Sequence, residues 1–170
     1  MNTFSLHRQQ LHAPRRTLRL LIEQTVGRDP YQPAPFQEAF EEQFRTMKIG
    51  YRATGGFAYG DDVASLMRDR VDQPVSVLAH AIVARRLVSF EWRQERLLPL
   101  FQFEAHDMSI HPATLQVVRE LCEVFDDWEM ALWFAQSNVW LHDEVPADLI
   151  RLDPAAVLEA ARADRFIACG

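Results

Sequence analysis

The chain has 170 residues, of which 48% are hydrophobic and 25% are charged, and its net charge is -6. This composition excludes a collagen-like protein and argues against extensive disorder, and the length suffices to bury a core without disulfides or metals. No apolar run reaches the ~20 residues of a membrane span, and the only two cysteines, Cys122 and Cys169, suit a reducing compartment, so we expect a cytoplasmic protein without membrane contact.

Charge is distributed unevenly along the chain. Residues 1–100 contain 14 Lys and Arg against 11 Asp and Glu, whereas residues 101–170 contain 4 against 13. A basic first part suits phosphate, and an acidic second part suits a basic protein surface. Two ordinary solvated faces would give the same counts.

The first 53 residues predict two helices joined by a proline-rich linker. Residues 15–26 place apolar side chains on one helical face. The second helix ends at Gly50, and its aromatic face comprises Phe36, Phe40, Phe44 and Met47. We expect residues 1–53 to form a helical region whose apolar faces pair two chains into a homodimer.

Residues 54–103 predict a helix-turn-helix followed by a small wing. Asp61 or Asp62 is expected to cap the first helix, and Pro74 opens the second. The wing is a hairpin formed by two β-type runs, residues 87–92 and 97–103.

Two features of this unit predict local geometry. Pro99 is expected to place the second β run at a sheet edge or in a bulge, because proline cannot donate to the ladder. Gly55 and Gly56 lack the neighbouring Lys and Ser or Thr of a nucleotide-binding loop, so they predict a simple turn.

The helix-turn-helix pattern makes promoter DNA a candidate partner. The second helix begins Pro-Val-Ser-Val, and its cationic residues, Arg85 and Arg86, lie at its end. Few side chains at its start can therefore form hydrogen bonds with base edges. The alternative is a helix-turn-helix retained only as a scaffold. The residues expected to contact DNA are Arg68, Arg70, Ser76, His80, Arg85 and Arg86.

Residues 104–170 predict helices throughout. Apolar periodicity indicates helices near 115–125 and 128–134, and Asp126 and Asp127 are placed to start the second of them. Pro146 and the Asp153–Pro154 pair start two more helices. The fold class is therefore mainly α, with a helical N-terminal region, 1–53, a winged helix-turn-helix-like unit with one β-hairpin, 54–103, and a C-terminal helical module, 104–170.

The loop that opens this module holds the nearest approach to a chemical cluster. His106, Asp107 and His111 could ligate a metal, but no second group with zinc-type spacing accompanies them. The competing interpretation is that Asp107 and His111 shape the loop before a helix. We favour this interpretation and expect no metal, no cofactor and no catalysis.

The last third of the chain resembles a known family. The string from Trp128 to Asn138, Trp-Glu-Met-Ala-Leu-Trp-Phe-Ala-Gln-Ser-Asn, followed by Leu141 and Pro146, resembles the toxin-binding domain of the Xre/MbcA/ParS antitoxins. The upstream strings Phe-Glu-Trp, ending at Trp92, and Leu-Pro-Leu-Phe-Gln-Phe, ending at Phe103, are similar to a hairpin region found in some members. The resemblance covers about residues 60–165.

One segment departs from that family. Between Leu141 and Pro146 the chain reads His-Asp-Glu-Val, where members usually carry a small residue, often glycine. A left-handed turn is less favourable without glycine, so we expect this turn to be shaped differently.

The resemblance implies a non-catalytic antitoxin, with a cognate toxin as its partner and autorepression at promoter DNA as a second role. It implies neutralisation of a RES-type, NAD-consuming toxin by occlusion of the toxin's active site. Removing the chain from Asp153 onward is then expected to abolish neutralisation and leave a folded core. The alternatives are a solitary transcriptional regulator without a toxin and a metal-dependent enzyme at the histidine loop. The expected toxin-binding residues are Trp140, Asp143, Glu144, Arg151, Asp164, Arg165 and Phe166.

Overall fold

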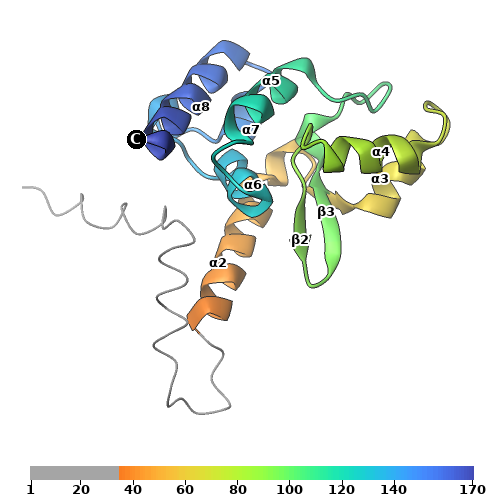
Figure 1. The fold of residues 1–170 in the computed structure, drawn as a ribbon, viewed down its shortest axis with the longest axis horizontal. Helices are drawn as coiled ribbons and strands as arrows, with labels where there is room; N and C mark the ends of the chain where they lie inside the picture. Colours follow the sequence, from red (N-terminus) through yellow and green to blue (C-terminus); the bar gives the residue numbers. More distant parts are fainter. Residues whose placement is uncertain (1–34) are drawn as a thin grey trace, which may run out of the picture. The chain divides into compact units, whose positions relative to one another are not determined.

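The computed structural model describes residues 35–170, which form helices and one small antiparallel sheet (Figure 1). The predicted mainly α fold with a β-hairpin is confirmed. The helix predicted at residues 15–26 lies outside the described residues. In chain order the elements are α2 (Pro35–Gly50), η1 (Arg52–Thr54), β1 (Phe57–Tyr59), α3 (Gly60–Met67), α4 (Pro74–Val83), β2 (Phe90–Trp92), β3 (Glu95–Pro99), η2 (Leu100–Gln102), α5 (Pro112–Leu121), α6 (Asp127–Ala135), η3 (Val139–Leu141), α7 (Pro146–Leu149) and α8 (Pro154–Cys169).

Residues 45–170 form one compact unit, and residues 35–44 belong to a second one. Within the larger unit, α5 to α8 gather on one side of the β2–β3 hairpin, and α3 and α4 lie on the other (Figure 1). The predicted boundaries after residues 53 and 103 do not coincide with this division, because core packing and hydrogen bonds cross both positions.

The sheet contains one strand more than the sequence predicted. Strand β1, which follows the Gly55–Gly56 turn, pairs with β3, so the strand order is β1-β3-β2. The hairpin itself is confirmed, with shorter strands than expected. Its two turn residues, Arg93 and Gln94, have φ values of 51° and 69°, the left-handed pair that matches the twist of a two-residue hairpin.

The prediction for Pro99 is wrong. Strand β3 is the central strand, and Pro99 pairs in continuous register with Phe57 of β1. Proline is tolerated there because it is the last residue of the strand, and the next residue, Leu100, donates its N–H to the Gly56 carbonyl at 2.9 Å.

Two helix starts are capped by aspartate side chains, and others begin with proline. The Asp126 carboxylate accepts from the Glu129 N–H, and Glu129 reciprocates in a capping box, while Asp153 accepts from the Ala156 N–H. Proline opens α4, α7 and α8 as expected, and Pro112, expected in the preceding loop, opens α5 as well. The prediction for Asp61 and Asp62 is wrong in detail, because the N-cap of α3 is Tyr59 and both aspartates lie within the first turn.

An aromatic column ties the end of α2 to the C-terminal helices. The buried Tyr51 ring stacks on Phe101 at 5.6 Å between centroids, and Phe101 packs on Phe134 at 4.9 Å. The Tyr51 hydroxyl donates to the Ala131 carbonyl at 2.5 Å, and complete burial raises the pKa of this tyrosine. Gly50 lies so close to α6 that an added Cβ would sit 2.0 Å from the Ala135 carbonyl oxygen.

Candidate protein-binding surface

The carboxylate of Asp164 on α8 joins three segments of the C-terminal module. Its Oδ2 accepts from the Trp133 indole at 2.7 Å and from the Asn138 amide at 2.9 Å. Its Oδ1 accepts from the Trp140 indole at 3.0 Å. Helix α6, the turn after it and η3 are therefore fastened to one point of α8, and Trp140 has a fixed orientation although its side chain is 51% exposed.

The turn that carries Trp140 closes through Asn138. The Asn138 side chain accepts from the Trp140 N–H at 2.9 Å, and its backbone N–H donates to the Glu144 carbonyl at 2.9 Å. His142 and Asp143 adopt φ values of 56° and 69°. The expectation of a differently shaped turn is therefore wrong, because the chain takes the left-handed conformation without glycine, held by the hydrogen bonds of Asn138.

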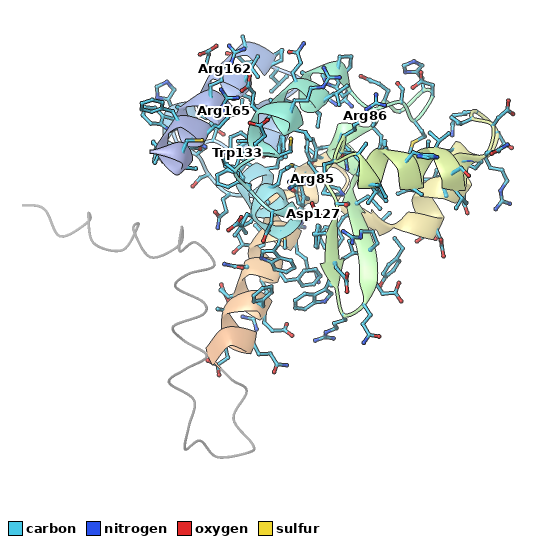
Figure 2. The ribbon with its side chains drawn as sticks, viewed as in Figure 1. Arg85, Arg86, Asp127, Trp133, Arg162 and Arg165 are labelled. Carbon is cyan, nitrogen blue, oxygen red and sulfur yellow. The ribbon has the colours of Figure 1, made fainter. Side chains whose placement is uncertain are left out.

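Helix α8 is also fixed to α5 by ion pairs. The guanidinium groups of Arg162 and Arg165, both labelled in Figure 2, approach the two carboxylate oxygens of Glu120 at 3.2 Å and 2.6 Å. Hydrogen bonds to Glu120 and Glu159 raise the pKa of Arg162, which keeps this pairing charged. On its inner face α8 buries Val157, Ala160 and Ala161.

This packing corrects one expectation. Removal of the chain from Asp153 onward cannot leave the module's core intact, because α8 supplies buried side chains to that core and the acceptor for the Trp133 indole. The function of α8 has to be tested by point substitutions on its exposed side.

Beyond these fixed contacts, η3 and the end of α8 present apolar side chains to solvent. On α8, Phe166 and Ile167 are 81% and 63% exposed, and on η3, Val139 and Trp140 are 60% and 51% exposed. We call these residues the C-terminal apolar surface. Large apolar side chains exposed on a fixed scaffold are typical of a protein-binding site.

Acidic side chains lie on the segment that follows η3. Asp143 and Glu144 are exposed, and Asp148 follows on α7. Burial and the neighbouring Glu144 raise the pKa of Asp148, as expected where carboxylates crowd together. This segment would favour a basic surface on a partner.

The predicted toxin-binding residues fall into two groups. Trp140, Asp143, Glu144 and Phe166 are exposed. Asp164, Arg165 and Arg151, the last of them exposed as well, each hold other segments of the chain: Asp164 and Arg165 as described above, and Arg151 by donating to Glu104 and to the carbonyls of Phe101 and Phe103 at 2.7 to 3.2 Å. We therefore assign these three a structural role, whereas Trp140 combines exposure with its hydrogen bond to Asp164.

The predicted DNA-binding residues also divide. Arg68, Ser76, His80 and Arg86 are exposed on or near α3 and α4. Arg70 is exposed but donates to the carbonyls of Leu66 and His106 at 2.6 and 3.1 Å. DNA contact by these residues stays a prediction.

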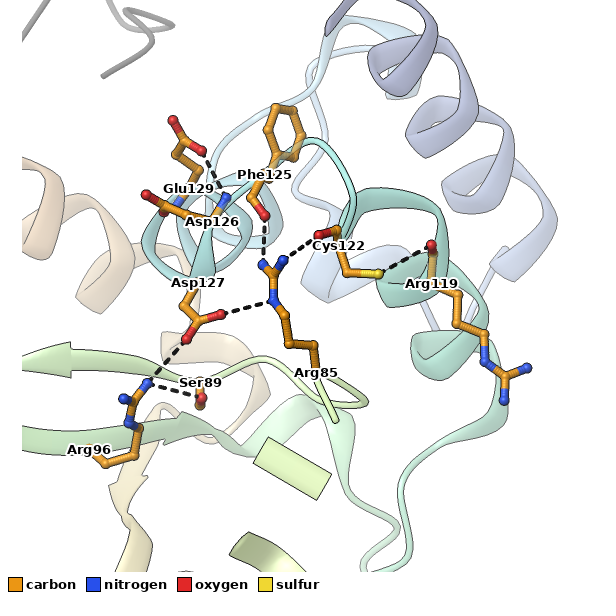
Figure 3. Close-up of polar contacts among 9 residues, drawn as sticks. All are labelled: Arg85, Ser89, Arg96, Arg119, Cys122, Phe125, Asp126, Asp127 and Glu129. Atoms are coloured by element: carbon orange, nitrogen blue, oxygen red, sulfur yellow. Dashed lines mark hydrogen bonds and ion pairs between the residues drawn. The ribbon is translucent and has the colours of Figure 1, made fainter. Parts of the chain in front are cut away.

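Arg85 is not available to phosphate, which corrects its assignment. It donates to the Phe125 carbonyl at 2.6 Å and to the Cys122 carbonyl, and it pairs with Asp127 at 3.3 Å (Figure 3). Asp127 also pairs with Arg96 of β3 at 3.3 Å. This network joins the end of α4 and the hairpin to the loop between α5 and α6, and no local sequence signal distinguishes Arg85 from Arg86.

The histidine loop does not converge on one point. His106 is 76% exposed and pairs with its neighbour Asp107 at 3.3 Å, while His111 faces Glu104 at 3.6 Å. Burial and the nearby Arg151 lower the pKa of His111. Within residues 35–170 no group of three or more candidate ligands forms a metal site.

Sequence reasoning missed part of the apolar surface. Val139 and Ile167 occupy apolar positions in helical segments, where burial is the usual expectation. The shortness of the Val-Trp-Leu helix could have indicated that Val139 is exposed, because a single turn turns one side chain to the core, and here that side chain is Leu141.

Comparison with models of known protein families, with curated proteins and with solved structures gives no match. Among the described residues, no helix combines the length and apolarity needed to cross a membrane.

Proposed function

We propose that this chain is an antitoxin-like binding protein that neutralises a partner toxin by covering the toxin's active site with its C-terminal apolar surface. The observation that carries the proposal is the exposure of Phe166 and Ile167, 81% and 63%, on a helix whose preceding turn is fixed by Asp164 and Arg165. A pre-ordered aromatic anchor loses little conformational entropy when it binds.

The class of toxin comes from the family resemblance. Antitoxins of the Xre/MbcA/ParS type imply a RES-type, NAD-consuming toxin, whose active site would be blocked by inserted apolar side chains rather than modified chemically. The acidic residues Asp143 and Glu144 would meet a basic rim on that toxin.

The test is co-expression with a RES-type toxin, preferably the product of an adjacent reading frame, with culture growth and cellular NAD as readouts. The wild-type chain should preserve both, and the double substitution Phe166→Asp with Ile167→Asp should lose protection because it places charge in the apolar contact. Binding of the purified double variant should weaken more than about tenfold, the effect of losing a hot spot.

Ile49→Asp is the matched control, because Ile49 is 74% exposed on α2, outside the C-terminal apolar surface. Circular dichroism should show native folding for both variants. Full protection by the Phe166 and Ile167 double variant would overturn the proposed surface, and failure of the wild-type chain to bind the toxin would overturn the proposed function.

A further inference from the structure

Helix α4 carries an apolar ridge on its outward side. Val75, Ala79 and Val83 recur every four residues along the helix, so they share one face. Val75 is 65% and Val83 83% exposed, and Ala79 is exposed as well. At 1.5 Å per residue the ridge is about 12 Å long, and it is the face that would have to enter a DNA groove if α4 read bases.

A hollow lies at one end of this ridge. It is an open hollow of about 210 Å³ between α3 and the start of α4. Its wall is partly apolar and includes a cationic and an anionic side chain, and its lining residues are Asp61, Ala64, Ser65, Arg68, Pro74 and Val75.

We propose that α4 is a homodimer contact in which it packs antiparallel against α4 of a second copy, about a two-fold axis at Ala79. The ridge is symmetric around that residue, since valine stands four positions before it and four positions after it. The axis therefore sets Val83 of each copy against Val75 and the hollow of the other. The small Ala79 side chains let the two backbones approach, as ridge packing along every fourth residue requires.

Charge at the two ends of α4 favours the same arrangement. Asp61 lies in the hollow beside the start of α4, and Arg86 is exposed just beyond its end. Neither side chain makes an ion pair with another residue of the 35–170 segment. An antiparallel pair brings Arg86 of one copy toward Asp61 of the other. Arg68 also lines the hollow, on the same copy as that Asp61.

This dimer and DNA reading by α4 exclude one another. Ser76 and His80 lie next to the ridge, so the second copy would cover part of the surface that base contacts need. Because the ridge is short and a stable interface buries ~800 Å² per partner, we expect a dimer that dissociates on dilution.

The first test measures the mass of the full chain by sedimentation velocity across a wide range of concentrations. Val83→Asp should raise the concentration at which half the chain is dimeric by more than about tenfold, because it buries a charge against the hollow. Leu152→Asp is the matched control: Leu152 is 80% exposed, far from α4 in the sequence, and its substitution should leave the midpoint unchanged. An equal midpoint for Val83→Asp and the wild-type chain, or a monomer at every concentration, would overturn the proposal.

The second test locates the two-fold axis along α4 by disulfide cross-linking. In a Cys169→Ser background, Ala79→Cys should form an intermolecular disulfide under mild oxidation, because a two-fold axis at this residue sets the two Cα atoms within the ~7 Å that a disulfide spans. Val77→Cys, on another side of α4, should not cross-link. Cross-linking through Val77→Cys in preference to Ala79→Cys would contradict the arrangement.

A charge exchange tests the polar contact. Asp61→Arg and Arg86→Asp should each weaken the dimer, and the double variant should recover it, since the pair is restored with its signs reversed.

DNA binding by the same face is the competing outcome. If the chain stays monomeric and duplex DNA protects Ala79→Cys from thiol labelling, this face of α4 binds DNA and the dimer proposal fails. None of these variants alters the C-terminal apolar surface, so toxin binding is measured independently.

Discussion

Individual polar side chains hold several segments of this chain together. The side-chain amide of Gln102 is completely buried and makes three hydrogen bonds: it donates to the carbonyls of Val88 and Pro99 at 2.8 Å and accepts from the Val88 N–H at 2.7 Å. It thereby replaces the backbone partner that Val88 lacks in the segment before β2. Asp164 likewise connects separate segments, because its carboxylate accepts hydrogen bonds from two tryptophan indoles and an asparagine amide.

Replacing Gln102 with leucine should destabilise the chain by about 3 kcal/mol, because the buried N–H and carbonyl of Val88 would be left without partners. Urea unfolding measures the change in free energy. Gln116→Leu, at an exposed position of α5, is the control and should cost less than about 0.5 kcal/mol. Equal stabilities of the two variants would show that the Gln102 network contributes nothing.

At the scale of elements, close packing of helix ends decides which substitutions the fold tolerates. The end of α2 approaches α6 at Gly50, where no side chain fits between the helix and the Ala135 carbonyl. Gly60, the first residue of α3, has only ordinary contacts available to a Cβ, the nearest being 3.7 Å from Leu98. The two glycines occupy helices and differ mainly in the space beside them.

Gly50→Ala should therefore lower the free energy of unfolding by about 3 kcal/mol, because the overlap is with backbone atoms that have to shift. Gly60→Ala should be neutral or slightly stabilising, since alanine restricts the unfolded chain more than glycine. Thermal and urea denaturation of both variants distinguish the outcomes, and a tolerated Gly50→Ala would mean that α2 and α6 are not in contact at this point.

For the larger unit as a whole, residues 54–103 and the C-terminal helices share one set of contacts. Arg85 of the first segment donates to carbonyls of the second (Figure 3), and Arg151 of the second donates to carbonyls of the first. The Phe101 ring adds a contact with Phe134 across the same boundary, at 4.9 Å between centroids, and the Tyr51 hydroxyl donates across it to the Ala131 carbonyl. Segments joined in this way are expected to unfold together.

Residues 54–103 and 104–170 should therefore lose their amide-exchange protection at the same denaturant concentration. Arg85→Ala should shift this common midpoint downward, whereas Arg86→Ala, which changes an exposed side chain, should not. Two separate transitions, one for each segment, would show that they are independent domains as the sequence first suggested.

The sequence by itself determined the elements whose signals are local. Proline at helix starts, the Asp126 and Asp153 caps, the Gly55–Gly56 turn and the run of β-type residues around the hairpin each act through neighbouring backbone atoms, so they can be recognised one segment at a time. The exposed Trp140 and Phe166 were also identified, through a family resemblance rather than through periodicity.

Only the tertiary structure decided which charged side chains remain free. Arg85 and Arg86 are adjacent and chemically identical. Arg85 nevertheless donates its hydrogen bonds to carbonyls 37 and 40 residues away, whereas Arg86 faces solvent. The central position of β3 likewise depends on β1, about forty residues earlier in the chain. Partners so distant along the chain leave no trace in local composition, because their meeting is a property of how the elements pack.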